Sequence, residues 1–474
     1  MVLSVVLTQC ALGDATSNAP REPRKKPSPP ETAPKVVPNT TEAMQTPEFW
    51  IDNIKGDPDK VILTPAQINE LNRKNQSRGI DFTAYNGEPY SIERTIVNRD
   101  ELGLQYNVED PLTLESFPGD SLRARIDRNI DWFRNRKLYD RRNMIYTDEM
   151  KDEIIDMMDV DSIPAAVTPR YGIVTRHSNG RQVPCDLKAN SGPGGWLDSF
   201  QVGMIDYASP VAVLHVSKDR DWYYVRSMIS FAWVPAENVA LGLRSEINDY
   251  VNSDDFLVCT EHKVPIYGDR DFDLFATYYY MGAKVRLLGK ENAGYRVSFP
   301  YRRQDGMFAT ATGWVKPDAR VHEGYQSFTQ RNIIDTVFTL LYRPYGWADS
   351  YNERDCCGMV RTVLRTFGLY TGRWTTHQLH ASDHIVMFPR KSPVEDKYKE
   401  LENCEAGICL VGNGGHIAMY LGKVGDSYYV IHQSGYSYEE DGVTYNVNRV
   451  NVNDTELPGG SNINNWTEIT TLKP

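Results

Sequence analysis

The spacing of hydrophobic positions changes along the chain. From about Thr46 to Asp161, apolar residues recur at intervals of three and four between polar loops, which is typical of helices packed on one face. The stretch that begins at Thr64 has a Thr cap followed by Pro at the first helical position, and 121–134 and 147–158 have the same period. The sequence therefore predicts a helical N-terminal segment over 44–161, which supports the rest of the molecule and carries no chemistry of its own.

Short alternating strands follow, and they form an internal repeat. Each copy has two strands around a polar turn and ends in a Trp-Val pair; the segments are 211–214, 222–225 and 233–234, and then 285–288, 295–297 and 314–315. Such strands with turn signals are typical of small all-β barrels. The repeat resembles bacterial SH3-like domains, which predicts two of them, over 162–243 and 244–321, with Trp233 and Trp314 in their cores.

Composition narrows the classes of function. The 474 residues carry a net charge of −11, so no basic surface for nucleic acid or anionic lipid is expected. The sequence has no uninterrupted run of about 18 apolar residues, which excludes an internal membrane-spanning helix. Seven cysteines are too sparse for a disulfide scaffold, and neither they nor the histidines have zinc-site spacing, so we expect no metal or cofactor. Cys404 and Cys409 are either bridged or two unpaired thiols.

The first 43 residues have the pattern of an export segment. A short apolar run over 1–11 precedes Pro-, Thr- and Lys-rich sequence, which predicts the end of a secretory signal and a disordered linker. Leu7-Thr-Gln-Cys10 resembles a bacterial lipobox, although Gln9 stands where a small residue is usual and the basic start is missing. We expect export to the periplasm or cell envelope, with Cys10 as a candidate lipid anchor to the membrane.

The chemistry is concentrated after residue 344. Apolar residues at 359, 360, 363, 364 and 367 share one helical face, so a helix is expected to begin at Asp355 to Cys357 and to end at Gly368. A thiol at a helix N-terminus has a lowered pKa, because unpaired N–H groups and the helix dipole favour the thiolate. Successive helical residues point about 100° apart, so only one of the two adjacent thiols can face a base.

Two histidines can supply that base. His416 begins one alternating strand and His432 lies near the end of the next, 16 residues later, with a hairpin turn over 423–426. Antiparallel pairing brings both imidazoles to the same end of the hairpin. One can then hold the cysteine as an ion pair while the other fixes its orientation.

The motifs Asp-Cys-x-Gly, Gly-His-Ile-x-x-Tyr-Leu-Gly and Val-Ile-His resemble those of the NlpC family of papain-like cell-wall peptidases. The resemblance implies a multi-domain α+β protein, in which an NlpC-type catalytic domain over 322–474 follows the two SH3-like barrels and the helical segment. It assigns Cys356 as nucleophile, His416 as base and His432 as the orienting third residue.

The same resemblance implies the substrate contacts. Tyr345 and Trp347 match aromatic residues beside the catalytic cleft, and Asp355 matches a residue that recognises the free amino terminus of a short muropeptide. Cys357 is also expected at the substrate site, although relatives usually have Ser there.

The implied activity is hydrolysis of peptidoglycan stem peptides, at the bond between D-glutamate and a diamino acid. We expect the protein to be a monomer. Three alternatives stay open: an amidase or acyltransferase with the same Cys–His pair, a non-catalytic wall-binding protein, and an adaptor that uses its SH3-like domains.

Overall fold

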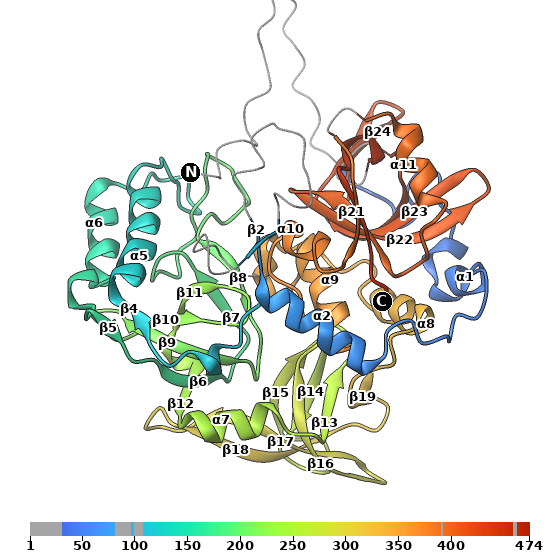
Figure 1. The fold of residues 1–474 in the computed structure, drawn as a ribbon. Coiled ribbons are helices and arrows are strands. Elements are labelled where there is room, and N and C mark those ends of the chain that lie inside the picture. Colours follow the sequence, from blue (N-terminus) through green and yellow to red (C-terminus); the bar gives the residue numbers. More distant parts are fainter. Residues whose placement is uncertain (1–30, 81–95, 99–107, 390–391, 458–461) are drawn as a thin grey trace, which may run out of the picture.

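The computed structural model describes residues 31–80, 96–98, 108–389, 392–457 and 462–474 (Figure 1). The predicted signal segment and Cys10 lie outside these ranges. Within them, no helix is both long enough and apolar enough to span a bilayer.

Three antiparallel sheets form the body of the molecule. The first has the order β12-β6-β9-β10-β11-β7-β8, with β6 (Arg170–Val174), β7 (Ser178–Arg181), β8 (Gln201–Ile205), β9 (Pro210–Val216), β10 (Trp222–Arg226), β11 (Phe231–Pro235) and β12 (Val239–Gly242). The second has the order β15-β14-β18-β17-β16-β13-β19, with β13 (Phe256–Cys259), β14 (Lys263–Tyr267), β15 (Phe275–Tyr280), β16 (Lys284–Glu291), β17 (Gly294–Arg302), β18 (Phe308–Val315) and β19 (Val321–Glu323). The third has the order β20-β27-β21-β22-β23-β26, with β20 (His384–Met387), β21 (Cys409–Asn413), β22 (His416–Val424), β23 (Ser427–Ser434), β26 (Arg449–Asp454) and β27 (Glu468–Thr471).

Helices pack around these sheets. They are α1 (Pro47–Asp52), α2 (Pro65–Ser77), α5 (Gly119–Arg134), α6 (Asp148–Met157), α7 (Arg244–Val251), α8 (Gln330–Phe338), α9 (Cys356–Arg365), α10 (Thr375–Leu379) and α11 (Val394–Leu401). The shorter strands β1 (Glu31–Thr32), β24 (Ser437–Glu440) and β25 (Val443–Asn446) make a three-stranded sheet, and β2 (Arg78–Ile80) with β3 (Ile96–Asn98) and β4 (Phe117–Pro118) with β5 (Ala166–Val167) make two pairs.

The helical N-terminal segment is divided between two parts of the molecule. The side chains of Trp50 and Leu71, from α1 and α2, belong to the same core as α8, α9 and the third sheet. Leu122 and Phe133 of α5 instead pack with the first sheet around Trp233. Figure 1 shows this separation, with α5 and α6 beside the first sheet and α2 beside α9. The helix predicted to start after Thr64 and those predicted over 121–134 and 147–158 are confirmed as α2, α5 and α6.

The prediction of a disordered linker over 1–43 is wrong for residues 31–43. Glu31 and Thr32 pair in parallel with Tyr445 and Asn446 of β25. Ala33 and Val37 are buried in a small core beside the third sheet. This stretch is Pro-rich, but its few apolar side chains find a hydrophobic surface at the far end of the chain, which composition alone does not reveal.

The two copies of the repeat use their Trp-Val pairs differently. Both pairs lie at the predicted strands, β11 and β18, and Trp233 is fully buried. Trp314 is only half-buried, under the guanidinium of Arg270, so its predicted place in a core is wrong. The following Val315 is fully buried instead.

Helix α9 lies at the centre, where the three sheets meet (Figure 1). Every residue from Cys356 to Leu364 is buried, including the polar Arg361 and Thr362. The second sheet reaches this helix through Gly282, whose φ is +78° and whose missing Cβ would lie 2.7 Å from that of Arg365. The helix is therefore covered on its polar face as well as on its apolar face.

Trp233→Ala is expected to lower the free energy of unfolding by about 3–5 kcal/mol, because a fully buried Trp leaves a large cavity. Trp314→Ala, the matched change in the second copy, should cost less, about 1–2 kcal/mol, since that side chain is already partly solvated. Chemical denaturation followed by fluorescence measures both values. Equal losses for the two variants would contradict the difference between the copies.

Candidate active site

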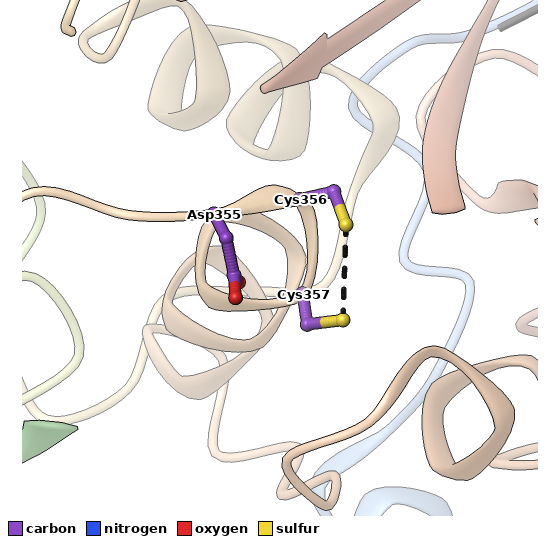
Figure 2. A group of neighbouring side chains, drawn as sticks. All are labelled: Asp355, Cys356 and Cys357. Atoms are coloured by element: carbon purple, nitrogen blue, oxygen red, sulfur yellow. Dashed lines mark hydrogen bonds between the residues drawn. The ribbon is translucent and has the colours of Figure 1, made fainter. Parts of the chain in front are cut away.

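The cysteine pair lies at the first turn of α9 (Figure 2). The helix begins at Cys356 as predicted, and Asp355 caps it by accepting a hydrogen bond from the Gly358 N–H at 2.8 Å. The Asp355 carbonyl accepts from Met359 N–H, which is the first intrahelical bond. The N–H groups of Cys356 and Cys357 precede that bond and therefore have no acceptor within the helix. A thiolate or an oxyanion at this turn is favoured electrostatically.

A chain of hydrogen bonds fixes which nitrogen of each imidazole carries a proton. Asn453 Nδ2 donates to the Asp454 carbonyl at 2.6 Å, so its Oδ1 faces His432 Nε2 at 2.5 Å. An amide oxygen only accepts, and thus His432 Nε2 is protonated and its Nδ1 is the acceptor. That Nδ1 lies 2.8 Å from His416 Nε2, which therefore donates. His416 Nδ1 is left to face the Cys356 thiol, which is hydrogen-bonded to this ring.

The two histidines share a face of the hairpin because of a β-bulge. At the turn, Lys423 lies opposite Tyr428. If this register continued unchanged along the hairpin, His416 and His432 would point to opposite faces of the sheet. The register shifts by one residue between Tyr420 and Gly422, after which Met419 lies opposite Ile431. By alternation, both histidines then point to the same side. The predicted hairpin is confirmed, and the bulge is what brings the two histidine side chains to the same face of the sheet.

The two thiols have opposite electrostatic environments. Their sulfur atoms lie 3.8 Å apart. The pKa of Cys356 lies well below its ordinary value, because Cys357 donates a hydrogen bond to it and the His416 ring adds its charge and a second hydrogen bond. The pKa of Cys357 is correspondingly raised by that bond and by burial. The geometry thus favours Cys356 as the thiolate.

A strained loop precedes the cysteines. In η6 (Trp347–Asn352), Ala348, Asp349, Tyr351 and Asn352 have φ between +48° and +63°. Such left-handed conformations cost about 1–2 kcal/mol for each non-glycine residue. Two contacts hold the loop: Gln201 of β8 donates to the Ala348 carbonyl at 3.3 Å, and Asp349 Oδ2 lies 2.9 Å from the Arg361 guanidinium. A Cβ on Gly358 would lie 1.9 Å from Asp349 Oδ1, which explains the glycine of the motif.

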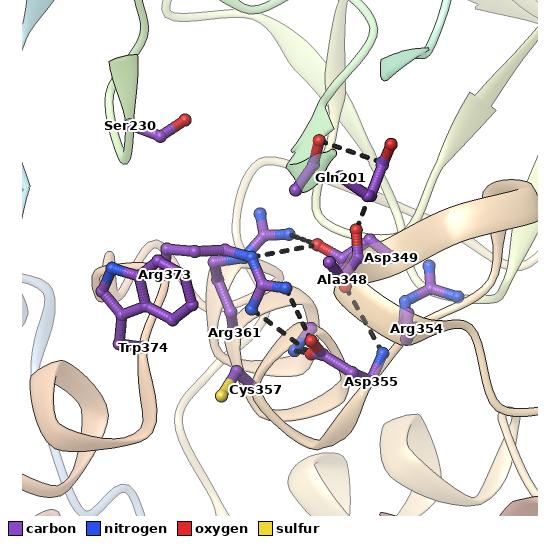
Figure 3. A network of polar contacts seen from close by, with 12 residues as sticks. Gln201, Ser230, Ala348, Asp349, Arg354, Asp355, Cys357, Arg361, Arg373 and Trp374 are labelled. Atoms are coloured by element: carbon purple, nitrogen blue, oxygen red, sulfur yellow. Dashed lines mark hydrogen bonds and ion pairs between the residues drawn. The ribbon is translucent and has the colours of Figure 1, made fainter. Parts of the chain in front are cut away.

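A buried network of charges joins this loop to the first sheet (Figure 3). Arg361 of α9 bridges Asp349 at 2.9 Å and Asp206, at the end of β8, at 3.0 Å. Arg365 also pairs with Asp206, whose pKa these two arginines hold well below its ordinary range against the effect of burial. Arg361, Asp206 and Asp349 are almost entirely inaccessible to solvent. The position of the nucleophile thus depends on a carboxylate from another sheet.

Asp355 has intramolecular partners in addition to its capping role. Arg373 donates to its Oδ2 at 2.6 Å and to its Oδ1 at 3.3 Å. Burial raises the pKa of the Asp355 carboxyl to about 6, with Arg373 opposing and Asp349 adding to the shift. The Asp355 carboxylate and the sulfurs of Cys356 and Cys357 lie within 4.8 Å of one another, a donor set that could hold a soft metal ion. The contact of Asp355 with a substrate amino group stays a prediction.

Aromatic side chains surround the approach to the cysteines. Tyr345 is half-buried, and burial together with the negative charges of Asp355 and Cys356 raises its pKa. Its ring meets that of Trp196, from the first sheet's region, edge to face at 5.7 Å. Trp347 and Trp196 are 37% and 51% exposed, which leaves both available to a ligand.

Sequence reasoning missed Asn453, Arg373, Asp349 and Asp206. Asn453 lies in an Asn-Val-Asn-Asp run, whose polar residues are unusual for a strand buried at every position from 450 to 454. The charged residues had no comparable signal, because their partners are distant in the chain.

Comparisons with known proteins agree with this architecture. A family model of an SH3 domain (SH3b1 type) matches residues 188–235. The structure resembles a solved NlpC/P60 endopeptidase from Photobacterium damselae subsp. piscicida with a TM-score of 0.69, at 16% identity over 94% of this chain and 99% of that chain. A solved NlpC/P60 family protein from Bacillus cereus, 18% identical over 58% of this chain and 83% of its own, has a TM-score of only 0.39. No curated protein matches the sequence.

The predicted resemblance to the NlpC family is therefore confirmed for the fold, together with an SH3b domain and a mixed helix-and-sheet architecture. The domain boundaries and the roles of the site residues remain predictions.

Gly358→Ala is expected to displace Asp349 and break its pairing with Arg361, which should lower the free energy of unfolding by about 3–5 kcal/mol. Gly192→Ala is the matched control, because a Cβ there meets nothing within 4 Å, and it should change stability by less than about 0.5 kcal/mol. Chemical denaturation measures both. A Gly358→Ala variant as stable as the control would show that the loop can move to admit the Cβ without loss of stability, which would contradict the prediction.

Alkylation by iodoacetamide should select Cys356 at mildly acidic pH. An ordinary thiol with a pKa of about 8.5 loses its thiolate on the order of 100-fold between pH 8 and pH 6, whereas the lowered pKa of Cys356 keeps it ionised. Peptide mass spectrometry at the two pH values follows each cysteine. His416→Ala removes one cause of the lowered pKa of Cys356, so the alkylation rate of Cys356 in this variant should fall at pH 6. A wild-type rate that drops as steeply as that of Cys404 would disprove the thiolate.

Proposed function

We propose that this protein is a cysteine peptidase of the bacterial cell envelope that hydrolyses peptidoglycan stem peptides. The bond we infer is the one between D-glutamate and a diamino acid, as the NlpC resemblance implies. The ordered chain Cys356–His416–His432–Asn453 is the observation that carries the proposal, because it supplies a nucleophile, a base and an orienting group in one line.

In the proposed mechanism, the Cys356 thiolate attacks the scissile carbonyl carbon. The oxyanion that forms lies at the N-terminus of α9, where the Cys356 and Cys357 N–H groups are available as donors. His416, protonated at both nitrogens in the ion pair, gives its Nδ1 proton to the leaving amine. A water molecule then donates a proton to His416 as it attacks the thioester, and cleavage of the C–S bond releases the acid and restores the thiolate–imidazolium pair.

His432 serves this cycle because it stays neutral. Burial and the charge of His416 lower the pKa of His432 well below its ordinary value, with only Asn453 opposing the shift. Its Nδ1 lone pair therefore remains an acceptor while His416 gains and loses protons. The His416 ring keeps one orientation through both steps.

The first sheet's region is the proposed limit on substrate size. Its Trp196 lies against Tyr345 beside the cysteine loop, and its Gln201 and Asp206 are bonded to residues 348 and 361. A wall built in this way closes one end of the cleft, which favours short peptides with a free amino terminus. We place Tyr345, Trp347, Asp355 and Cys357 at this substrate site.

The partner and location follow from the same proposal. An SH3b domain next to an NlpC/P60-type fold suits a peptidoglycan substrate outside the cytoplasm. An amidase or acyltransferase would use the same pair of residues on another acyl group, and the mass of the released amine separates these activities from a peptidase.

Incubation with purified stem tripeptide and with intact sacculi tests the activity by product mass spectrometry. The tripeptide should be cleaved at the glutamyl bond, and much faster than the sacculi, because the closed cleft excludes cross-linked chains. Cys356→Ala should lower the rate by about 10⁴-fold or more, and His432→Phe by about 10²-fold through loss of ring orientation.

Cys357→Ser is the matched control for the nucleophile. It keeps a small hydrogen-bond donor beside Cys356, so it should retain at least about a tenth of the wild-type rate. Full activity of Cys356→Ala with loss of activity in Cys357→Ser would transfer the role to the second thiol. Equal rates on tripeptide and sacculi would contradict the closed cleft.

A further inference from the structure

Two adjacent thiols at the start of α9 have the separation of a metal-binding pair. The Cys356 and Cys357 sulfurs lie 3.8 Å apart and both lie on one side of the first helical turn (Figure 2). Two thiolates bound tetrahedrally to a cation at about 2.3 Å are themselves about 3.8 Å apart. The pair is thus already spaced for one ion, and the catalytic proposal requires only one of the two sulfurs.

We propose that Asp355, Cys356 and Cys357 form a binding site for a thiophilic divalent cation such as Zn²⁺ or Cd²⁺, and that the bound ion blocks the nucleophile. The ligand atoms of these three residues lie within 4.8 Å of one another, and they form the only such group found in the described part of the chain. Soft thiolates select these cations over Mg²⁺ or Ca²⁺. The binding site stands on the donor set alone, whereas the blocking of the nucleophile rests on the proposed peptidase function.

The three residues can bind an ion without leaving their present positions. The Asp355 carboxylate offers about four acceptor directions, so it can retain its bonds to Gly358 and Arg373 and still offer a lone pair. Binding displaces the proton of the Cys357 thiol, and the two thiolates then balance the charge of the ion.

The consequence is reversible inhibition by competition for one sulfur. A Cys356 thiolate bound to a cation cannot attack a carbonyl, and His416 loses its partner. The spacing rules used for sequences miss such a site, because they look for cysteines separated by two or more residues rather than for neighbours at a helix start.

Cadmium titration of the reduced full-length chain tests this directly. Thiolate-to-metal charge-transfer absorption reports the sulfur ligands, and native mass spectrometry gives the number of ions bound. The Cys404 thiol is hydrogen-bonded to Cys409 and forms a second neighbouring pair, so the matched background is Cys404→Ser. That variant should still bind one ion. Adding Cys356→Ser or Cys357→Ser should weaken binding by more than about 100-fold, because even outer-shell changes cost about 10–100-fold.

Circular dichroism checks that each variant is folded, and one folded cysteine variant is sufficient for the test. If Cys356→Ser and Cys357→Ser each bind cadmium as tightly as the Cys404→Ser background, the site is overturned. Asp355→Asn should weaken binding by about tenfold, and an unchanged affinity would remove Asp355 from the ligand set. A chain that binds cadmium but cleaves no stem peptide would refute the proposed function alone, whereas one that cleaves but binds no ion would refute this site alone.

Discussion

The structure depends on the pairing of Arg361 with two carboxylates, Asp349 and Asp206. A buried guanidinium is costly to desolvate, and an unpaired one is strongly destabilising. Arg361 therefore requires the loop before the cysteines and the end of β8 to be in place together. Because Arg361 is on the same short helix as Cys356, the nucleophile cannot be positioned by its own sheet alone.

The same pairing explains features that look unrelated. The left-handed residues of the η6 loop are held because Asp349 is anchored, and the glycine at 358 makes room for that carboxylate. Arg373 neutralises Asp355 next to the developing thiolate, while Gly203 of β8 admits its guanidinium at close range. Strain before the nucleophile is thus balanced by ion pairs behind it.

Much of the site could be predicted from sequence because its signals are local. The helix face after Asp355, the alternating strands around the 423–426 turn and the strands of the Trp-Val repeat are all encoded over a few residues. These elements are observed at their predicted places, although only the first Trp-Val pair has its Trp in a core. The charge network could not be predicted, since Asp206 and Arg361 are 155 residues apart and neither belongs to a motif. The docking of 31–43 was hidden for the same reason, because a Pro-rich stretch becomes ordered only on a surface formed by the C-terminal strands.

Leu421 is the extra residue of the β-bulge between Tyr420 and Gly422, and it bears on how this hairpin tolerates changes of length. It sets the phase between two strands, and no part of its own side chain takes part in the chemistry. Deletion of Leu421 would keep every proposed catalytic residue and most of the hydrogen bonds between β22 and β23. It would nevertheless turn one of the two imidazoles to the opposite face of the sheet. A substitution at Leu421 alters identity at constant length, so it would test the packing of this side chain in the core and leave the phase of the strands unchanged. Single-residue deletions and insertions are the changes to which this pair of strands is most sensitive.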